Sequence, residues 1–376
     1  MRFGFTGYYG MQNYGDDLFV AAVSMAGKEY WGNEIYCLSS EIKGIDTVFL
    51  VKSNRKLYSS SSKIAKLYRS FKMLELFRKS DIVLLAGGST IGSHTSNNMR
   101  NFQSKLVTRK VAKLGALGVS IGPFINEEDY KKAKNLISSM EYISVRDKKS
   151  YDLVQSMNIS TPLYYGRDLA GIIPRYIKVE KGERKNKRLG ISLCYYEKYT
   201  NGNVSMERND LNQIISGIKY FLECNNSIEV TIFVLNNHAE IGDQEISNEL
   251  FEQLDLLDLN KLSVIIHKND PLDIWSKIGE LDMMFTVRLH GAITAYLTQV
   301  PFVLFEYHKK CTDFLDDIGY DKKYRLERNI PSPEKVKNIL SYISSDKYNV
   351  SLDISSYIEN VTSSFENAPW IESEIK

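Results

Sequence analysis

Short apolar runs alternate with helical patterns along most of the chain, and this alternation constrains the fold more than any other feature. The runs are rich in Ile, Val, Leu and Phe, as expected for strands buried on both faces of a parallel sheet. The predicted strands are residues 2–6, 81–86, 119–121, 142–145, 163–165, 189–194, 230–235, 264–267, 283–287 and 302–305. Helical segments between them, such as the one opened by Asp270-Pro271, indicate a doubly wound α/β architecture.

The chain length predicts two domains, because 376 residues are more than one hydrophobic core usually serves. A charged segment, residues 173–188, is the predicted linker between two Rossmann-like domains, residues 1–172 and 189–330. Residues 331–376 are expected to form a helical tail that can pack back on the N-terminal domain. Two such domains facing a cleft place the carboxyl ends of both sheets at that cleft, where open α/β folds bind ligands.

Composition limits the classes of function. Lys and Arg total 48 against 46 Asp and Glu, so global charge gives no support for a nucleic-acid partner. No apolar stretch approaches the ~18–20 residues of a membrane span, and the N-terminus lacks the pattern of a signal peptide. The four cysteines form no CxxC pair, which argues against zinc-ribbon and disulfide frameworks and favours a cytoplasmic protein.

Two glycine-rich loops follow predicted strands in the N-terminal half. The first contains Gly7, Gly10, Asn13 and Asp16, and the second runs from Gly87-Gly88 to His94. Such loops let the backbone approach a ligand and place N–H groups where an anion or a sugar can dock. Neither loop matches the GxGxxG or GxxxxGK[ST] pattern, so nicotinamide and P-loop functions are disfavoured. Either loop alone is equally typical of an ordinary βα turn.

Arginine and aspartate end two later strands of the same half. In Ser144-Val145-Arg146-Asp147, the Arg146 side chain can present its planar fork to a carboxylate or phosphate. Asp147 is equally suited to be the N-cap of the following helix. The next strand ends in Gly166-Arg167-Asp168.

The most informative motif is Arg288-Leu289-His290-Gly291, at the end of a predicted strand. Residues two apart in an extended segment point the same way, so Arg288 and His290 are expected to project together. A fixed cation, an imidazole and a helix N-terminus suit an anionic substrate that must be protonated.

The following strand ends in Glu306-Tyr307-His308-Lys309-Lys310 and brings more positive charge to the same sheet edge. The five histidines show no HxxxH or HExxH spacing and no DxD stands at a strand end, so no metal site is predicted.

Together these motifs resemble the polysaccharide pyruvyl transferase family of bacterial cell-surface polysaccharide synthesis. The resemblance covers most of residues 1–320 and rests on Asn13-Tyr14-Gly15-Asp16, Gly87-Gly88, Ser120-Ile121-Gly122-Pro123, Ser144-Val145-Arg146-Asp147 with Ser150, Asp168-Leu169-Ala170, Arg288-Leu289-His290-Gly291 and Tyr307…Lys310…Phe314…Gly319. It implies a GT-B-like fold and a transferase of capsule or exopolysaccharide biosynthesis. It also implies phosphoenolpyruvate as donor, a sugar acceptor, a pyruvate ketal as product, and neither metal nor other cofactor.

The resemblance and the chemistry of these residue types together suggest candidate site residues. Arg288 and His290 look like the donor-site pair, and an imidazole that titrates near neutral pH makes His290 the candidate general acid. Donor binding is completed by Lys310 and Arg146. The acceptor candidates are Asn13, Asp16, Asp168 and His94, and Asp16 is also a catalytic candidate.

The sequence departs from the family pattern at two places. Ser89 stands where the family often has a third glycine, and His308-Lys309 stands where it often has Asp-Pro. Lys309 therefore remains an alternative to Lys310.

A strongly basic segment, residues 52–79, holds nine Lys and Arg against the single Glu75. Its apolar residues recur at helical spacing: Ile64, Leu67, Tyr68, Phe71, Leu74 and Phe77. A basic amphipathic helix can lie on an anionic membrane, here through Lys63, Lys66, Arg69 and Lys72, and would place the enzyme at the inner face. An ordinary surface helix that packs its apolar stripe on the sheet is the alternative.

Two other functions remain open at this stage. One is a GT-B-type glycosyltransferase, whose nucleotide-sugar donor would use the same cationic pair. The other is a non-catalytic scaffold in a polysaccharide assembly complex. The sequence leaves open whether the acceptor is free or lipid-linked.

Overall fold

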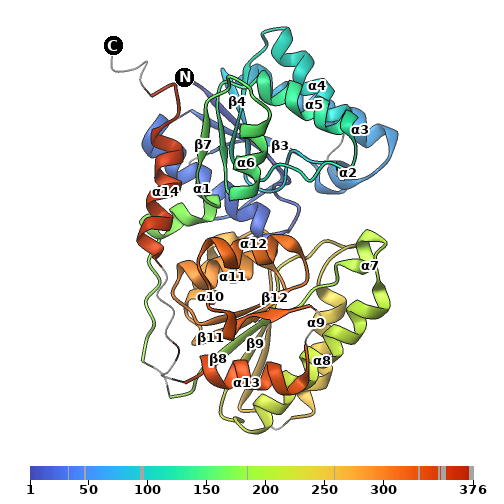
Figure 1. Ribbon diagram of the computed structural model, residues 1–376, viewed down its shortest axis with the longest axis vertical. Helices are drawn as coiled ribbons and strands as arrows, with labels where there is room; N and C mark the ends of the chain where they lie inside the picture. The colour runs from blue at the N-terminus through green and yellow to red at the C-terminus, as the bar shows by residue number, and fades with distance from the viewer. Residues whose placement is uncertain are drawn as a thin grey trace. The chain divides into compact units, whose positions relative to one another are not determined.

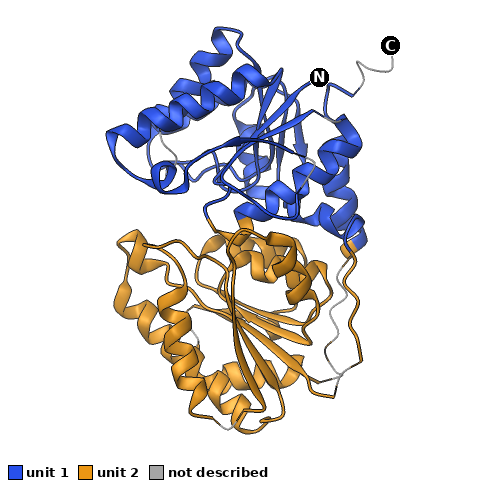
Figure 2. Cartoon of the chain, turned by 180° about the vertical axis from the view of Figure 1, so that it is seen from behind, with its two compact units in different colours: residues 1–11, 16–177, 355–376 blue, residues 12–15, 178–354 orange. Residues whose placement is uncertain are grey.

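The structure is a computed structural model that describes residues 1–32, 34–45, 48–93, 97–183, 185–257, 259–328, 331–345, 348 and 353–371. The chain forms two compact units (Figure 2). Unit 1 comprises Met1–Met11, Asp16–Ile177 and Ser355–Lys376, and unit 2 comprises Gln12–Gly15 and Lys178–Ile354. The main division therefore falls inside the predicted linker, and a four-residue segment near the N-terminus belongs to unit 2.

Unit 1 is built on a seven-stranded parallel sheet with the order β3-β2-β1-β4-β5-β6-β7 (Figure 1). Its strands are β1 (Phe3–Thr6), β2 (Ile35–Ser39), β3 (Phe49–Lys52), β4 (Ile82–Ala86), β5 (Lys113–Val119), β6 (Ile143–Val145) and β7 (Leu163–Tyr165). The helices are α1 (Tyr14–Trp31), α2 (Arg55–Ser59), α3 (Lys63–Lys79), α4 (Asn97–Thr108), α5 (Glu127–Ser138), α6 (Lys148–Ser156) and α14 (Ile354–Glu366), with a 3-10 helix η1 (Leu169–Arg175).

Unit 2 has a six-stranded parallel sheet with the order β10-β9-β8-β11-β12-β13. Its strands are β8 (Arg188–Ser192), β9 (Glu229–Val234), β10 (Lys261–Ile266), β11 (Met283–Thr286), β12 (Phe302–Glu306) and β13 (Leu326–Glu327). The helices are α7 (Glu197–Thr200), α8 (Val204–Glu223), α9 (Gln244–Asp255), α10 (Pro271–Gly279), α11 (Leu289–Leu297), α12 (Lys309–Asp317) and α13 (Pro333–Ile343), with a 3-10 helix η2 (Lys322–Tyr324).

Each sheet has one point at which the strand order reverses direction. In unit 1 this switch point lies between β1 and β4, and in unit 2 it lies between β8 and β11. Loops that leave neighbouring strands in opposite directions open a crevice at their carboxyl ends, where doubly wound folds bind ligands. A ligand-binding site is therefore expected at each of the two switch points.

Most predicted strands are confirmed, and the exceptions are β2, β3, β5 and β13. The predicted strand 119–121 is wrong, because β5 ends at Val119 rather than starting there. Gly115 and Gly118 interrupt its apolar pattern, yet both are needed: a Cβ at Gly115 would crowd the backbone of Tyr142, and Gly118 has φ +60°. Three strands, β2, β3 and β13, were not predicted.

The C-terminal region differs from the single tail expected for residues 331–376. Helix α13 lies in unit 2, where it packs on α8, and α14 lies in unit 1 except for its first residue. Within unit 1, the Ser364 carbonyl accepts a hydrogen bond of 2.9 Å from Tyr142 Oη, and the Phe365 carbonyl accepts one of 3.1 Å from Trp31 Nε1. The last helix thus completes the core of the first domain.

Candidate functional site

Unit 1 contains a cavity of about 310 Å³ at its switch point. Its walls come from the loops after β1 and β4 and from helices α2, α3 and α4. The polar side chains that line it include Asp16, Thr90, Arg100 and Gln103, while Met73 of α3 forms part of the apolar wall. The volume is at the lower end of ordinary ligand pockets, which suits one small polar ligand.

The glycines predicted to admit a ligand shape this cavity. Gly87 and Gly88 adopt φ +70° and +72°, a left-handed conformation that side chains rarely tolerate. The neighbouring first loop is held by Asp17, whose Oδ1 accepts a 2.6 Å hydrogen bond from the Gly10 amide. Asp16 is the carboxylate that lines the cavity, and its role in acceptor binding stays a prediction.

Asn13 lies elsewhere, because residues 12–15 pack on unit 2. Asn13 pairs with Asn236 as an antiparallel bridge, and the Tyr14 amide donates a 2.8 Å hydrogen bond to the Leu235 carbonyl. The Tyr14 hydroxyl lies 2.7 Å from Thr294 Oγ1 of α11. The two neighbouring acceptor candidates, Asn13 and Asp16, therefore belong to different units.

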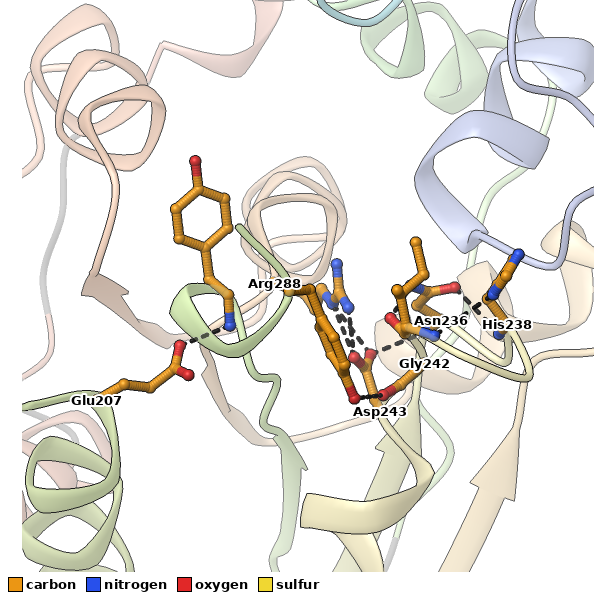
Figure 3. Close-up of polar contacts among 9 residues, drawn as sticks. Glu207, Asn236, His238, Gly242, Asp243 and Arg288 are labelled. Atoms are coloured by element: carbon orange, nitrogen blue, oxygen red, sulfur yellow. Dashed lines mark hydrogen bonds and ion pairs between the residues drawn. The ribbon is translucent and has the colours of Figure 1, made fainter. Parts of the chain in front are cut away.

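Arg288 is the N-cap of α11, just after β11 at the switch point of unit 2, and it forms an ion pair with Asp243 (Figure 3). Arg288 Nε lies 3.0 Å from Asp243 Oδ2, and Nη2 also donates to the same carboxylate. Asp243 is fully buried and accepts a 2.9 Å hydrogen bond from the Asn236 amide, whereas Arg288 keeps about 20% of its side chain exposed. Within the described residues Nη1 donates no hydrogen bond, so this edge of the guanidinium is open.

Electrostatics keep Arg288 positively charged. Burial lowers the pKa of this guanidinium, but the Asp243 carboxylate outweighs burial and raises the pKa above its ordinary value. The pair is nevertheless close to neutral as a whole. Asp243 therefore holds the guanidinium in one orientation while it cancels much of its long-range field.

His290 lies in the first turn of α11, where its ring packs against Gly15. A Cβ built at Gly15 would be 2.6 Å from His290 Cε1, and closer to Cγ and Nδ1. Gly15 is thus the residue that makes room for the imidazole. The α1 segment that carries Gly15 is fixed to unit 2 through Tyr14, so the ring is packed against an ordered backbone.

The positive charges of Lys310 and Arg288 both affect the pKa of one buried thiol, that of Cys194. Burial raises the pKa of Cys194 to about 12, and the positive charges of Arg288 and Lys310 both oppose that shift. Lys310 is half-buried with its ammonium 5.7 Å from the centre of the Tyr307 ring, whereas Lys309 is exposed. Lys310 is thus the less exposed of the two alternatives, and its role in donor binding stays a prediction.

Two other polar residues, at the end of β12 and just after it, have structural partners. Glu306 is buried and accepts hydrogen bonds of 2.9 and 2.6 Å from Arg325. His308 is the N-cap of α12, and its Nδ1 accepts a 3.1 Å hydrogen bond from the Lys310 amide.

Arg146 and Asp168 form a buried ion pair in unit 1. Arg146 Nη1 lies 2.7 Å from Asp168 Oδ2, and the side chains are 9% and 4% exposed. Arg146 Nε donates a 2.7 Å hydrogen bond to Ser120 Oγ. Asp147 is the N-cap of α6 and accepts a 2.8 Å hydrogen bond from the Ser150 amide. His94 lies outside the described residues.

Asp243 and Gly15 are the site residues for which the sequence motifs assigned no role. Asp243 lies 45 residues from Arg288 and comes from the loop after β9, so no local pattern connects the two. Gly15 stood inside a recognised motif, but its contact with His290 crosses 275 positions of sequence. Only the packing of residues 12–15 within unit 2 reveals that contact.

The comparison with protein families decides the assignment. The family model for polysaccharide pyruvyl transferase matches residues 13–309. The chain belongs to the polysaccharide pyruvyl transferase family. It is therefore an enzyme of the transferase class, and the family's substrates imply a polysaccharide acceptor. No curated protein sequence matches the chain significantly.

Solved structures similar to this chain include UDP-N-acetylglucosamine 2-epimerases. The one from Methanocaldococcus jannaschii is 11% identical with a TM-score of 0.60, and the match covers 96% of this chain and 98% of that chain. The one from Rickettsia bellii is 10% identical with a TM-score of 0.56, and the match covers 100% and 95%. A glycotransferase of kitacinnamycin is 10% identical with a TM-score of 0.50, and the match covers 99% and 98%. These likenesses show the fold, which is the predicted GT-B type.

Proposed function

We propose that this family member transfers pyruvate from phosphoenolpyruvate to a sugar diol and so forms a cyclic ketal on a bacterial surface-polysaccharide precursor. The observation that carries the proposal is that Arg288 and His290 at the start of α11, and Lys310 at the start of α12, follow two neighbouring strands of the unit 2 sheet. Phosphoenolpyruvate has a carboxylate and a phosphate, and both need cationic or N–H donors.

In this proposal the donor is held by three kinds of groups. Lys310 supplies a point charge, the open Nη1 edge of Arg288 supplies directed hydrogen bonds, and the first amides of α11 face negative charge favourably. Because Asp243 neutralises much of the Arg288 charge, Lys310 contributes the larger share of attraction. Asp243 acts as a positioning residue for the Arg288 fork.

The chemistry then follows from protonation of the donor. His290 delivers a proton to C3 of the enol ester, which makes C2 electrophilic. One acceptor hydroxyl adds to C2, the C2–O bond to phosphate breaks, and a second hydroxyl closes the ketal. The two hydroxyl protons balance the proton gained at C3 and the one taken up by the released hydrogen phosphate. No resident cofactor takes part in this sequence.

The acceptor sugar is assigned to the unit 1 cavity, where Asp16, Gln103 and Thr90 offer hydrogen-bonding groups. We propose that the acceptor is a lipid-linked precursor and that the enzyme works in the cytoplasm at the inner membrane face. The free state of all four cysteines is in keeping with a reducing compartment. Asn13, Asp168 and Arg146 stay predictions, as does the role of His94.

The test is phosphate release from phosphoenolpyruvate in the presence of a panel of galactosides, glucosides and mannosides, with the product identified by NMR. We expect His290→Asn to remain folded and to lose at least about two orders of magnitude in turnover, the usual scale of general acid–base catalysis. Near-normal phosphate release by this variant would remove His290 from its role.

Thermal unfolding with each donor class separates the proposal from a glycosyltransferase. A ligand that binds the folded state raises the melting temperature by linkage. Phosphoenolpyruvate should raise it, and Arg288→Ala should abolish that shift. A shift with nucleotide sugars and none with phosphoenolpyruvate would favour the glycosyltransferase.

A further inference from the structure

Helix α3 carries large apolar side chains that the fold leaves exposed. Ile64, Leu67 and Phe71 are 70%, 73% and 62% exposed, although the sequence allowed all apolar positions of this helix to face the sheet. Their spacing places them on one side of the helix. The buried side is formed by Ala65, Met73, Leu76 and Phe77. The helix therefore has two apolar sides, and only one of them packs in unit 1.

The surroundings of this exposed triplet are strongly basic. Lys63 flanks the triplet on the same helix, while Lys66 lies further round the helix on a side chain long enough to reach the same interface. Lys56 lies on α2, and all three lysines are exposed. Glu75 is the single acidic residue of the segment, and it is engaged by Lys72 at 2.9 Å and Lys79 at 3.3 Å. An apolar patch with cationic flanks is complementary to a surface that offers hydrocarbon and negative charge together.

Arg69 and Lys72, which the sequence analysis placed on the membrane, contact other residues of the protein instead. Arg69 Nη1 donates 2.7 Å hydrogen bonds to the carbonyls of Tyr58 and Ser60, and so fixes the turn between α2 and α3. Lys72 is only 17% exposed and pairs with Glu75. The expectation that both contact lipid is corrected accordingly, and the patch is reduced to Lys63, Lys66 and the apolar triplet.

We propose that Ile64, Leu67 and Phe71 insert into the headgroup region of an anionic phospholipid membrane, with Lys63 and Lys66 on the lipid phosphates. The membrane association proposed above would then take place through α3. Binding of this docking surface to lipid does not depend on the transfer chemistry. Figure 1 shows α2 and α3 at the outer side of unit 1.

The docking surface is close to the unit 1 cavity. Met73 of α3 and Tyr58 of α2 line that cavity from the opposite side of the same helical pair. One helix thickness, roughly 10 Å, therefore separates the membrane-facing side chains from the cavity wall. A lipid-linked sugar could occupy the cavity while its lipid remains in the bilayer. This last step rests on the proposed function.

Co-sedimentation of the full chain with vesicles tests the proposal. We expect binding to vesicles that contain phosphatidylglycerol, weaker binding to pure phosphatidylcholine, and a steep loss with added salt. The variant Ile64→Ser/Leu67→Ser/Phe71→Ser should lower the binding constant by roughly tenfold or more. Lys63→Glu/Lys66→Glu should lower it by at least about fivefold per lysine, since each cation near an anionic membrane surface contributes on the order of that factor.

Matched controls use exposed residues outside α2 and α3. Ile125→Ser replaces a side chain that is 75% exposed, and Lys261→Glu/Lys268→Glu reverses two exposed charges in unit 2. Both controls should bind vesicles as the unaltered chain does. All variants should release phosphate from phosphoenolpyruvate with a soluble acceptor at the same rate, so a failure of the transfer chemistry is recognised separately.

Two results would overturn the proposal. The first is absent vesicle binding, or binding that the triple serine variant and the double glutamate variant both retain. The second is self-association in sedimentation velocity that the triple serine variant removes, which would assign this surface to a second copy of the chain.

Discussion

Gly15 offers a way to disturb the His290 ring without altering the imidazole itself. A Cβ built at this position lies 2.6 Å from His290 Cε1, whereas ordinary van der Waals contact begins near 3.4 Å. Because Nδ1 and Cγ would be closer still, the ring in Gly15→Ala has to move by more than about 1 Å. We expect the side chain to yield rather than the helix, because rotation about its torsions moves the ring at low cost compared with a shift of packed backbone.

The expected magnitude follows from this displacement. A misplacement of about 1 Å in a catalytic group costs up to about 100-fold in rate, which corresponds to about 2.7 kcal/mol of transition-state stabilisation. Folding should change little, because alanine is favoured over glycine inside a helix by up to about 1 kcal/mol. Gly15→Ala should therefore lose about 100-fold in turnover and keep a melting temperature close to that of the unaltered chain.

The assay is phosphate release from phosphoenolpyruvate, measured beside thermal unfolding. Gly182→Ala is the matched control, because a Cβ at Gly182 meets nothing within 4 Å. The double variant Gly15→Ala/His290→Asn should be hardly slower than His290→Asn alone, since both changes act through one ring. Unchanged turnover in Gly15→Ala would refute the reasoning, and so would independent, multiplicative losses in the double variant.

Further predictions concern buried charges and thiols. Asp243→Asn leaves the mostly buried Arg288 without its counter-charge, so the free energy of unfolding in urea should fall by about 3 kcal/mol. If the free energy of unfolding of Asp243→Asn fell by less than about 1 kcal/mol, the Asp243–Arg288 pair would orient the guanidinium without stabilising the fold. Asp168→Ala should lower the same quantity by about 3–5 kcal/mol because Arg146 is buried. If Asp168→Ala instead lost affinity for the donor while its free energy of unfolding stayed the same, Arg146 would have a role in donor binding. In neutral iodoacetamide, mass spectrometry should find the exposed Cys224 alkylated first, because burial raises the pKa of the other three thiols. Alkylation of all four cysteines at the same rate would contradict the burial of the other three thiols.

The sequence alone determined the architecture, because buried parallel strands need continuous apolar runs. Ile82–Ala86 is such a run, all of its residues are buried, and it was predicted as a strand. The same local rules placed the Asp270 cap, whose side chain accepts a 3.1 Å hydrogen bond from the Asp273 amide. Family motifs then identified Arg288 and His290, since both stand in one short, ordered segment.

The tertiary structure decided which partners these residues have. Asp243 reaches Arg288 from the loop of another strand, and Gly15 meets His290 only because residues 12–15 pack on unit 2. It also decided which apolar side of α3 is buried, a choice that helical spacing leaves open because both sides repeat with the same period. The physical reason is common to all three: propensity and spacing act between neighbours in sequence, whereas ion pairs and packing depend on segments that only folding brings together.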